Sequence, residues 1–259
     1  MAEIRVHRET PSIAVVTIDN PARRNALTLA MWRGLREACA EVSEDRQVRA
    51  VILTGAGDHF CAGADISEFA ELRTGLEAAA EYEDAVDACE DALMTLGKPT
   101  IAAISGYCVG GGCGLATCCD FRVADRSARF AIPAAKLGIV YGLRECQSLF
   151  SLVGLANAKR ILFGGEQLDA AEAARIGLVD ELVETDAQSA TMDLAGRLAG
   201  NAPLSIAGAK VALNALALGQ AKERAAEIAD LVMSAMTSED YQEGTRAFME
   251  KRPPVFTGR

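Results

Sequence analysis

The chain has 259 residues, half of them apolar, which is enough for one large domain or for a core domain with a helical extension. Its formal net charge is −10, and its sequence shows no basic stripe of the kind found in nucleic-acid-binding proteins, so we expect no nucleic-acid partner. No run of about 18 apolar residues and no secretory leader pattern is present, so we expect a cytoplasmic protein without a membrane span.

The first half of the chain alternates strand-like and helix-like segments. Residues 12–18 form an apolar, β-branched run that predicts a buried strand. Thr28 is placed to cap a helix that extends to about Asp45 with one apolar stripe. Residues 49–54 and 100–105 predict two further buried strands.

The stretch 67–96 is rich in Ala, Glu and Asp, and it predicts helix with a weak apolar stripe. A helix with so few apolar anchors is expected to be a mobile cover rather than a core element. Further short elements are expected beyond it: strands at 121–124, 128–132 and 178–183, and helices at 143–153, 155–163 and 169–175.

From residue 187 onward the pattern is wholly helical, with a break near Asn201-Ala202-Pro203. Such helices bury little surface by themselves, so they must pack on the body or on another subunit. We therefore divide the chain into a core of residues 1–199 and a helical unit of residues 200–259.

Eight cysteines are present, and four of them crowd residues 108–119. None forms a C-x-x-C pair, and the two histidines, His7 and His59, are distant in sequence, so the spacing predicts no metal site. Cysteines in this pattern are typical of small buried apolar residues in a reducing cytosol.

Two strand-to-helix junctions carry small residues, one from His59 to Ile66 and the other from Gly106 to Gly114. Small residues let a ligand approach the main chain, and the first N–H groups of a helix have no helical partner. The second junction does not match the dinucleotide fingerprint G-x-G-x-x-G. If the two junctions face each other, two N–H groups meet on one oxygen as an oxyanion hole.

Motifs for other catalytic chemistries are absent from the sequence. It contains no G-x-S-x-G elbow, no H-E-x-x-H pair and no P-loop. A Ser–His–Asp triad would have to use His7 or His59, and neither has a site-like context. The chain therefore offers two glycine-rich junctions and no recognisable nucleophile or metal site.

Several segments carry, in order, a pattern known from one family. They are residues 25–27, 60–66, 98–104, 106–113, 119–120, 173–179 and 243–252. In these segments, which span nearly the whole chain, the sequence resembles the crotonase superfamily, also called the enoyl-CoA hydratase/isomerase family.

The resemblance implies an α/β fold, a crotonase-type spiral of repeated ββα units with a C-terminal helical trimerisation domain. It implies a homotrimer or a dimer of trimers that acts on an acyl-CoA thioester, with no cofactor beyond the coenzyme A moiety. The oxyanion donors fall on Ala64 and Gly111. The coenzyme A contacts fall on Arg24, Ala26, Ala62, Asp65 and Ile66, and in the tail, within the same or a neighbouring subunit, on Phe248 and Lys251.

Hydratases of this family carry two catalytic glutamates, and the matching positions here are Gly114 and Ala134. Hydration needs a general base on water and a proton donor at carbon, and neither residue transfers a proton. The sequence therefore predicts an acyl-CoA enzyme that stabilises a thioester enolate, with weak or no hydratase turnover.

Two alternatives remain open. The chain also shows some similarity to methylmalonyl-CoA decarboxylases, at residues 238–244 and at Tyr141, but it has Ala64 where they have His and Gly114 where they have Glu. Loss of CO₂ generates an enolate without a base that removes a carbon-bound proton. The other alternative is a pseudoenzyme that binds acyl-CoA without turnover.

Two residues are candidates to replace the missing glutamates. Glu145 lies near the start of a predicted helix, where it either serves the active site or only complements the helix dipole. Tyr141 either donates a hydrogen bond or proton, or is a packed loop aromatic. Asp65 and Asp120 are expected to be structural. Arg144 is either a partner for an acidic acyl group or a surface charge, and Glu68 either faces the coenzyme A channel or lies on a mobile helix.

Overall fold

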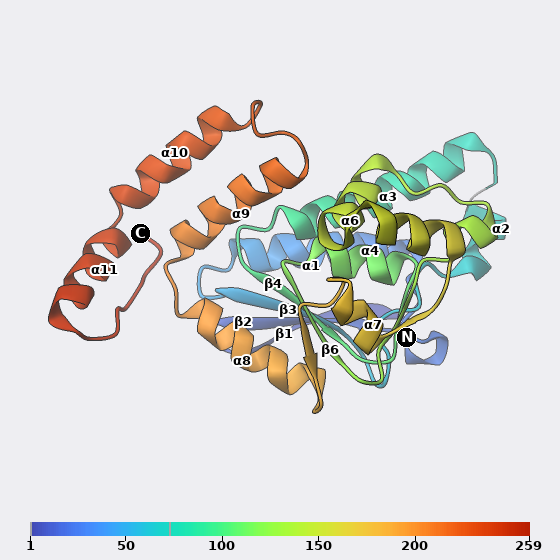
Figure 1. The fold of residues 1–259 in the computed structure, drawn as a ribbon, viewed down its shortest axis with the longest axis horizontal. Coiled ribbons are helices and arrows are strands. Elements are labelled where there is room, and N and C mark those ends of the chain that lie inside the picture. The colour runs from blue at the N-terminus through green and yellow to red at the C-terminus, as the bar shows by residue number, and fades with distance from the viewer. Residues whose placement is uncertain (1, 73) are drawn as a thin grey trace.

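The structure is a computed structural model that describes residues 2–72 and 74–259. Its centre is a six-stranded sheet in the order β1-β2-β3-β4-β6-β9 (Figure 1). Strands β1 and β2 form an antiparallel hairpin, and each later strand runs parallel to its neighbour. The strands are β1 (Glu3–Thr10), β2 (Ile13–Asp19), β3 (Ala50–Gly55), β4 (Thr100–Ile104), β6 (Phe121–Asp125) and β9 (Glu181–Val183).

A second, three-stranded sheet lies beside the carboxyl end of the first. Its strands are β5 (Tyr107–Val109), β7 (Arg129–Ala131) and β8 (Leu168–Asp169). The principal helices are α1 (Leu29–Glu44), α2 (Phe69–Leu72), α3 (Leu76–Met94), α4 (Gly111–Cys118), α5 (Ala134–Leu137), α6 (Leu143–Gly164), α7 (Ala170–Arg175), α8 (Ala187–Ala199), α9 (Pro203–Ala217), α10 (Ala225–Met236) and α11 (Glu239–Glu250). The orders β4-β5-α4 and β6-β7-α5 are the repeated ββα units that the resemblance predicts.

The large sheet is buried on both faces, which explains its continuous apolar strands. Residues 14, 16 and 18 of β2 face a core shared with α1, α3 and α4. Residues 13 and 15 face the opposite side, where Ala195 and Ala199 of α8 cover the sheet. Figure 1 shows α8 on one side of the sheet and α1, α3 and α4 on the other.

Most predicted elements are confirmed to within a few residues. Thr28 caps α1 by accepting a hydrogen bond from the N–H of Met31. The two helices expected over 143–163 form α6, which breaks at Gly154, where φ is +72°. Strand β1 was not predicted, because most of its residues are exposed and it lacks a strong apolar alternation.

The expectation that 67–96 forms a mobile cover is wrong for α3. This helix buries a stripe that includes Tyr82, Val86, Cys89 and Leu93, and it packs against α1 and α4. The stripe looked weak in the sequence because it is narrow and also contains Glu90, which is 1 % exposed. Helix α3 is therefore part of the core and fixes one wall of the site described below.

The cysteines are buried thiols, as predicted. Seven of the eight are buried and none of the eight forms a disulfide. Burial raises the pKa of Cys39 to about 11 and that of Cys61 to about 12, so both thiols stay protonated near neutral pH.

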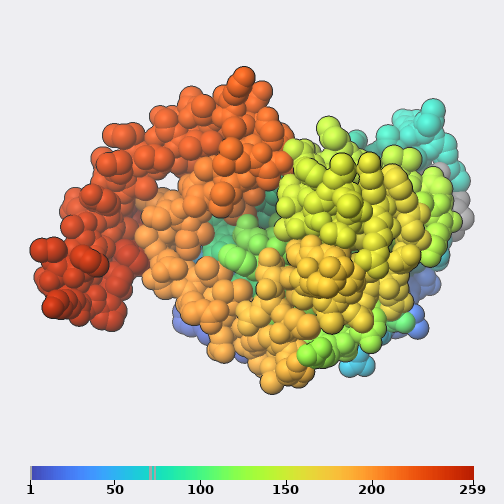
Figure 2. Space-filling view, in the orientation of Figure 1, coloured from blue at the N-terminus to red at the C-terminus, as the bar shows by residue number. Residues whose placement is uncertain are grey.

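The last three helices, α9 to α11, project from one side of the body (Figures 1 and 2). The buried Lys210 of α9 joins them to the large sheet, since its Nζ lies 2.8 Å from Asp120 Oδ2 and 3.2 Å from the carbonyl oxygen of Lys98. Behind α11 the chain turns back, and Arg49 donates to the carbonyl oxygen of Phe256. Among the described residues, no helix is long and apolar enough to cross a membrane.

Candidate acyl-group site

The two glycine-rich junctions lie side by side. Cys61 and Cys108 pair as neighbouring strand residues, with the Cys61 N–H donating to the Tyr107 carbonyl and the Val109 N–H donating to the Cys61 carbonyl. On its other side, the first junction pairs with the segment before α1 through Leu27 and Ala64. The backbone of Ala64 is thereby held beside the start of α4.

Glycine makes this close approach possible. Gly63 has a φ of +96°, and a Cβ there would lie 2.8 Å from the carbonyl oxygen of Val109 and 3.3 Å from the nitrogen of Gly111. A Cβ on Gly111 would lie 2.9 Å from the ring of Trp32. Side chains at either position would push the two junctions apart or displace the tryptophan.

The backbone N–H groups of Ala64 and Gly111 are free to bind a ligand. Within residues 2–72 and 74–259, no protein atom accepts a hydrogen bond from either group. Gly111 is the first residue of α4, where the helix dipole is positive. Both residues border a cavity of about 140 Å³. Two such donors beside a cavity can stabilise an oxygen on which negative charge develops.

The cavity walls come from elements far apart in the sequence. Trp32 of α1 donates from its Nε1 to the hydroxyl of Tyr82 on α3, at 3.2 Å. Val86 of α3 and Ala134 of α5 line the same cavity, and Ala134 presents only a methyl group. The other polar side chains that line the cavity are those of Glu83, Tyr141 and Glu145.

The structure brings both candidate replacement residues to this cavity. Glu145, the third residue of α6, accepts a hydrogen bond from the Gly142 N–H, so it caps the helix while bordering the cavity. Burial raises the pKa of Glu145 above its ordinary value. Burial also raises the pKa of Tyr141, so its hydroxyl stays protonated and can donate. Helix capping and a place at the site are therefore compatible for Glu145.

One residue that was not singled out in the sequence lies next to this site. Glu90 of α3 is 1 % exposed, and its Oε1 has no hydrogen-bond partner among the described residues. A Cβ on Gly114 would lie 2.6 Å from that oxygen. The sequence feature that could have identified Glu90 is its place within the apolar stripe of Tyr82, Val86 and Leu93. Nothing local in the sequence relates it to Gly114.

Residues expected to contact coenzyme A lie around the first junction. The exposed Arg24 places its guanidinium 4.9 Å from the centre of the Tyr107 ring, and its carbonyl accepts from the Ala62 N–H. Ala26 is buried beneath this loop, and Ile66 is 65 % exposed beside it. These residues frame a surface that leads to the cavity.

Asp65 has the structural role expected of it. Burial is the largest single influence and raises its pKa, but hydrogen bonds from Ser67 and the charge of Arg23 together hold the pKa below the ordinary value. Three other charged residues are also structural: Glu68 accepts from the Leu29 N–H at the start of α1, Asp120 accepts from Thr100, and Arg144 pairs with Asp91.

Within one chain, the tail residues do not reach this site. Phe248 and Lys251 belong to α11 and its end, on the projecting unit, and both are exposed (Figure 1). Their predicted contact with coenzyme A would therefore need a neighbouring subunit.

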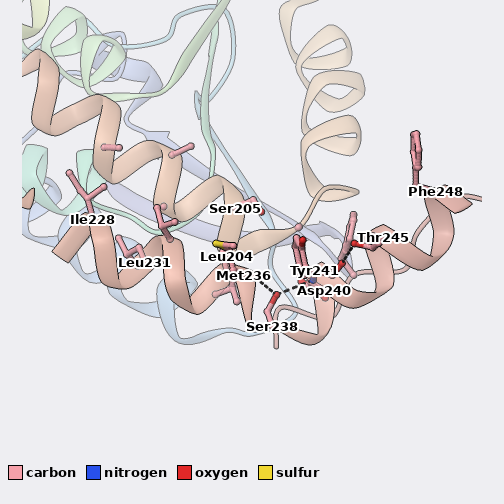
Figure 3. Close-up of a pocket in the computed structure, with 18 residues that line it drawn as sticks. Leu204, Ser205, Ile228, Leu231, Met236, Ser238, Asp240, Tyr241, Thr245 and Phe248 are labelled. Atoms are coloured by element: carbon pink, nitrogen blue, oxygen red, sulfur yellow. Dashed lines mark hydrogen bonds between the residues drawn. The ribbon is translucent and has the colours of Figure 1, made fainter. Parts of the chain in front are cut away.

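A larger hollow, of about 720 Å³, lies within the C-terminal helices. Figure 3 shows Ile228 and Leu231 of α10 in the space between α9 and α10. Its one acidic residue, Asp240, is bound by the backbone N–H groups of Thr257 and Gly258. The side chains that line this hollow are mostly apolar.

Comparison with known proteins agrees with this geometry. Residues 8–259 match the model of the enoyl-CoA hydratase/isomerase family. The chain is 37 % identical over 242 residues to the short-chain-enoyl-CoA hydratase of Clostridium acetobutylicum, covering 93 % of this chain and 92 % of the relative. It is 35 % identical to the 2,3-dehydroadipyl-CoA hydratase of Escherichia coli, over the full length of both. A crystal structure of an enoyl-CoA hydratase/carnithine racemase from Magnetospirillum magneticum superposes with a TM-score of 0.93 at 40 % identity, covering 100 % of this chain and 97 % of that one.

Proposed function

Because this chain belongs to the enoyl-CoA hydratase/isomerase family, the crotonase superfamily, we propose that it transforms an acyl-CoA thioester through an enolate held by the N–H groups of Ala64 and Gly111. The observation that carries the proposal is the pair of unpartnered N–H groups beside one cavity. Removing one such donor typically costs about 3–4 kcal/mol of transition-state stabilisation, so two donors account for a substantial rate enhancement.

The coenzyme A part of the substrate is proposed to lie along Arg24, Ala26, Ala62, Asp65 and Ile66. The guanidinium of Arg24 is exposed and can meet the anionic end of coenzyme A, although the net charge of the chain is −10. No cofactor beyond the coenzyme A moiety is required by this chemistry.

Decarboxylation is the second candidate function. The positions of the two family glutamates hold Gly114 and Ala134, and Tyr141 borders the cavity with a protonated hydroxyl that can donate to an acyl carboxylate. Loss of CO₂ would then produce the enolate directly, beside the same donors. Binding without turnover is the third possibility.

Assay of the purified protein separates these functions. We expect coenzyme A esters to raise the melting temperature, and at least one of crotonyl-CoA and methylmalonyl-CoA to be consumed. Consumption of methylmalonyl-CoA alone would favour decarboxylation, and stabilisation without turnover of either ester would favour the non-catalytic binder. Failure of every coenzyme A ester to bind would contradict the proposal.

We also infer that the projecting helices α9 to α11 join three copies of the chain, so that Phe248 and Lys251 meet coenzyme A in a neighbouring subunit. The apolar residues Val232, Met233 and Met236 of α10 are each more than half exposed in a single chain, which supports an interface there. The division at residue 200 stays a prediction.

Light scattering after gel filtration tests the assembly. We expect a mass of three or six times 27.3 kDa for the natural chain, and a lower mass for Met236→Asp, because burying an unpaired charge opposes association. The control Gln188→Asp places the same charge on an exposed position of α8 and should leave the mass unchanged. A monomeric natural chain would contradict the inference.

A further inference from the structure

A buried carboxyl oxygen without a hydrogen-bond partner among the described residues lies in the core near the candidate site. Glu90 belongs to the buried stripe of α3, one turn beyond Val86, which lines the cavity. Its Oε1 is inaccessible to solvent and lacks a hydrogen-bond partner among residues 2–72 and 74–259. An unpaired buried carboxyl is costly, and a protein that retains one next to a ligand cavity commonly uses it.

The carboxyl group occupies the space that a side chain at position 114 would need. Glu90 Oε1 lies 2.6 Å, and its Cδ 3.7 Å, from the position of a Cβ on Gly114. A glutamate at position 114 would carry its carboxyl carbon two C–C bonds of about 1.5 Å each beyond that Cβ. The carboxyl of Glu90 therefore fills space directly beside position 114, and α3 presents it instead of α4.

One of the charged groups that influence the pKa of Glu90 also lines the cavity. Burial, followed by repulsion from Glu145 and Asp87, raises its pKa to about 8, while Arg144 acts in the opposite direction and Asp91 raises it further. Glu145 is the cavity-lining residue among these four. From α4, the facing titratable group is the protonated thiol of Cys118, and from the loop before α6 it is the protonated hydroxyl of Tyr141.

We propose that Glu90, reaching across the side-chain-free Gly114, is the second carboxyl group of the acyl-CoA site and works as a pair with Glu145 in adding water to a 2-enoyl-CoA. This assignment rests on the acyl-CoA function proposed above. It replaces both family glutamates with carboxyl groups from α3 and α6. Glu145 borders the cavity and meets the substrate, whereas Glu90 acts through Glu145 as a positioning residue that holds a proton.

The proton balance of the step is simple. Glu90 is buried and Glu145 is half-buried, and burial disfavours the charged form most at Glu90, so we assign the one proton of the pair to Glu90. The carboxylate of Glu145 takes a proton from water while the water oxygen bonds the β-carbon and the C=C electron pair moves onto the thioester oxygen. The enolate then collapses, one proton passes from the pair to the α-carbon, and the pair again holds one proton.

The test is hydration of crotonyl-CoA by the full-length protein and four variants. Glu90→Gln keeps the shape of the side chain but cannot release or hold the exchangeable proton, and we expect kcat to fall about 100-fold with little change in the affinity for crotonyl-CoA. The double variant E90A/G114E returns the carboxyl to α4, and we expect it to regain activity relative to Glu90→Ala. The control Asp84→Asn removes an exposed carboxyl from the same helix and should match the natural chain.

The pH profile separates this role from a purely structural one. Because the pKa of Glu90 is raised, its proton is present below about pH 8 and is lost above it, so kcat should fall on the basic side of that value. Glu90→Gln should lack this basic limb. Natural kcat and an unchanged limb in Glu90→Gln would overturn the inference and leave the acyl-CoA function standing. Binding of crotonyl-CoA without hydration by the natural chain would also overturn it, whereas absence of binding would remove the proposed function as well.

Discussion

We expect Gly63→Ala to lower the kcat for an acyl-CoA substrate by 10²- to 10³-fold while the protein remains folded. The added Cβ would lie 2.8 Å from the Val109 carbonyl oxygen and 3.3 Å from the Gly111 nitrogen, so the two junctions must separate. Separation misaligns the N–H groups of Ala64 and Gly111, and loss of one oxyanion donor typically costs about that factor. Steady-state kinetics should show the loss in kcat, since the donors act on the charge of the transition state.

Gly57→Ala is the matched control. Gly57 has a φ of +70°, so alanine meets a similar backbone strain there, but no heavy atom lies within 4 Å of the added Cβ. Both variants should lose about 1–2 kcal/mol of stability from the left-handed conformation. Equal kcat in the two variants would show that the approach of the junctions is irrelevant to catalysis.

Asn25→Ala should lower the free energy of unfolding by about 3–5 kcal/mol, the largest stability effect that we expect from a single polar side chain. Asn25 is fully buried, and its Oδ1 accepts from the Asn20 N–H while its Nδ2 donates to the carbonyls of Ala56 and His59. Alanine leaves all three backbone groups without these partners. Urea denaturation followed by circular dichroism measures the change.

Two further variants identify the cause. Asn25 has a φ of +59°, so part of the loss in Asn25→Ala reflects strain, which Asn25→Gly removes while the hydrogen bonds remain lost. Asn201→Ala alters an exposed asparagine and should change stability by less than about 0.5 kcal/mol. If Asn25→Gly were as stable as the natural chain, the hydrogen bonds would have no measurable value.

The elements that the sequence predicted well are those whose signals are local. The apolar run of β2 and the cap of α1 at Thr28 depend on residues a few positions apart. The edge strand β1 was not predicted, because only its pairing with β2 identifies it. The burial of α3 was not predicted, because the surface that covers it belongs to α1, which ends more than 30 residues earlier.

The residues of the site also differ in whether a local sequence signal could identify them. The runs of small residues predicted the two junctions, because a close backbone approach needs residues with little or no side chain. The family resemblance then assigned the donors to Ala64 and Gly111. Glu145 could be proposed from its place near a helix start, and Tyr141 from the similarity to methylmalonyl-CoA decarboxylases, but the sequence did not decide between them. Glu90 could not be proposed from the sequence, because its proximity to Gly114 arises only when α3 packs against α4.

The shared space between Glu90 and Gly114 also constrains how such a chain can evolve. A glutamate at both positions would require the Glu90 carboxyl to move, since a Cβ at 114 already approaches Glu90 Oε1 to 2.6 Å. A lineage that moves the carboxyl from one helix to the other therefore either repacks Glu90, passes through a small residue at both positions, or changes both together. The effects of substitutions at 90 and 114 should be strongly non-additive, so neither position can be interpreted in a relative without the other.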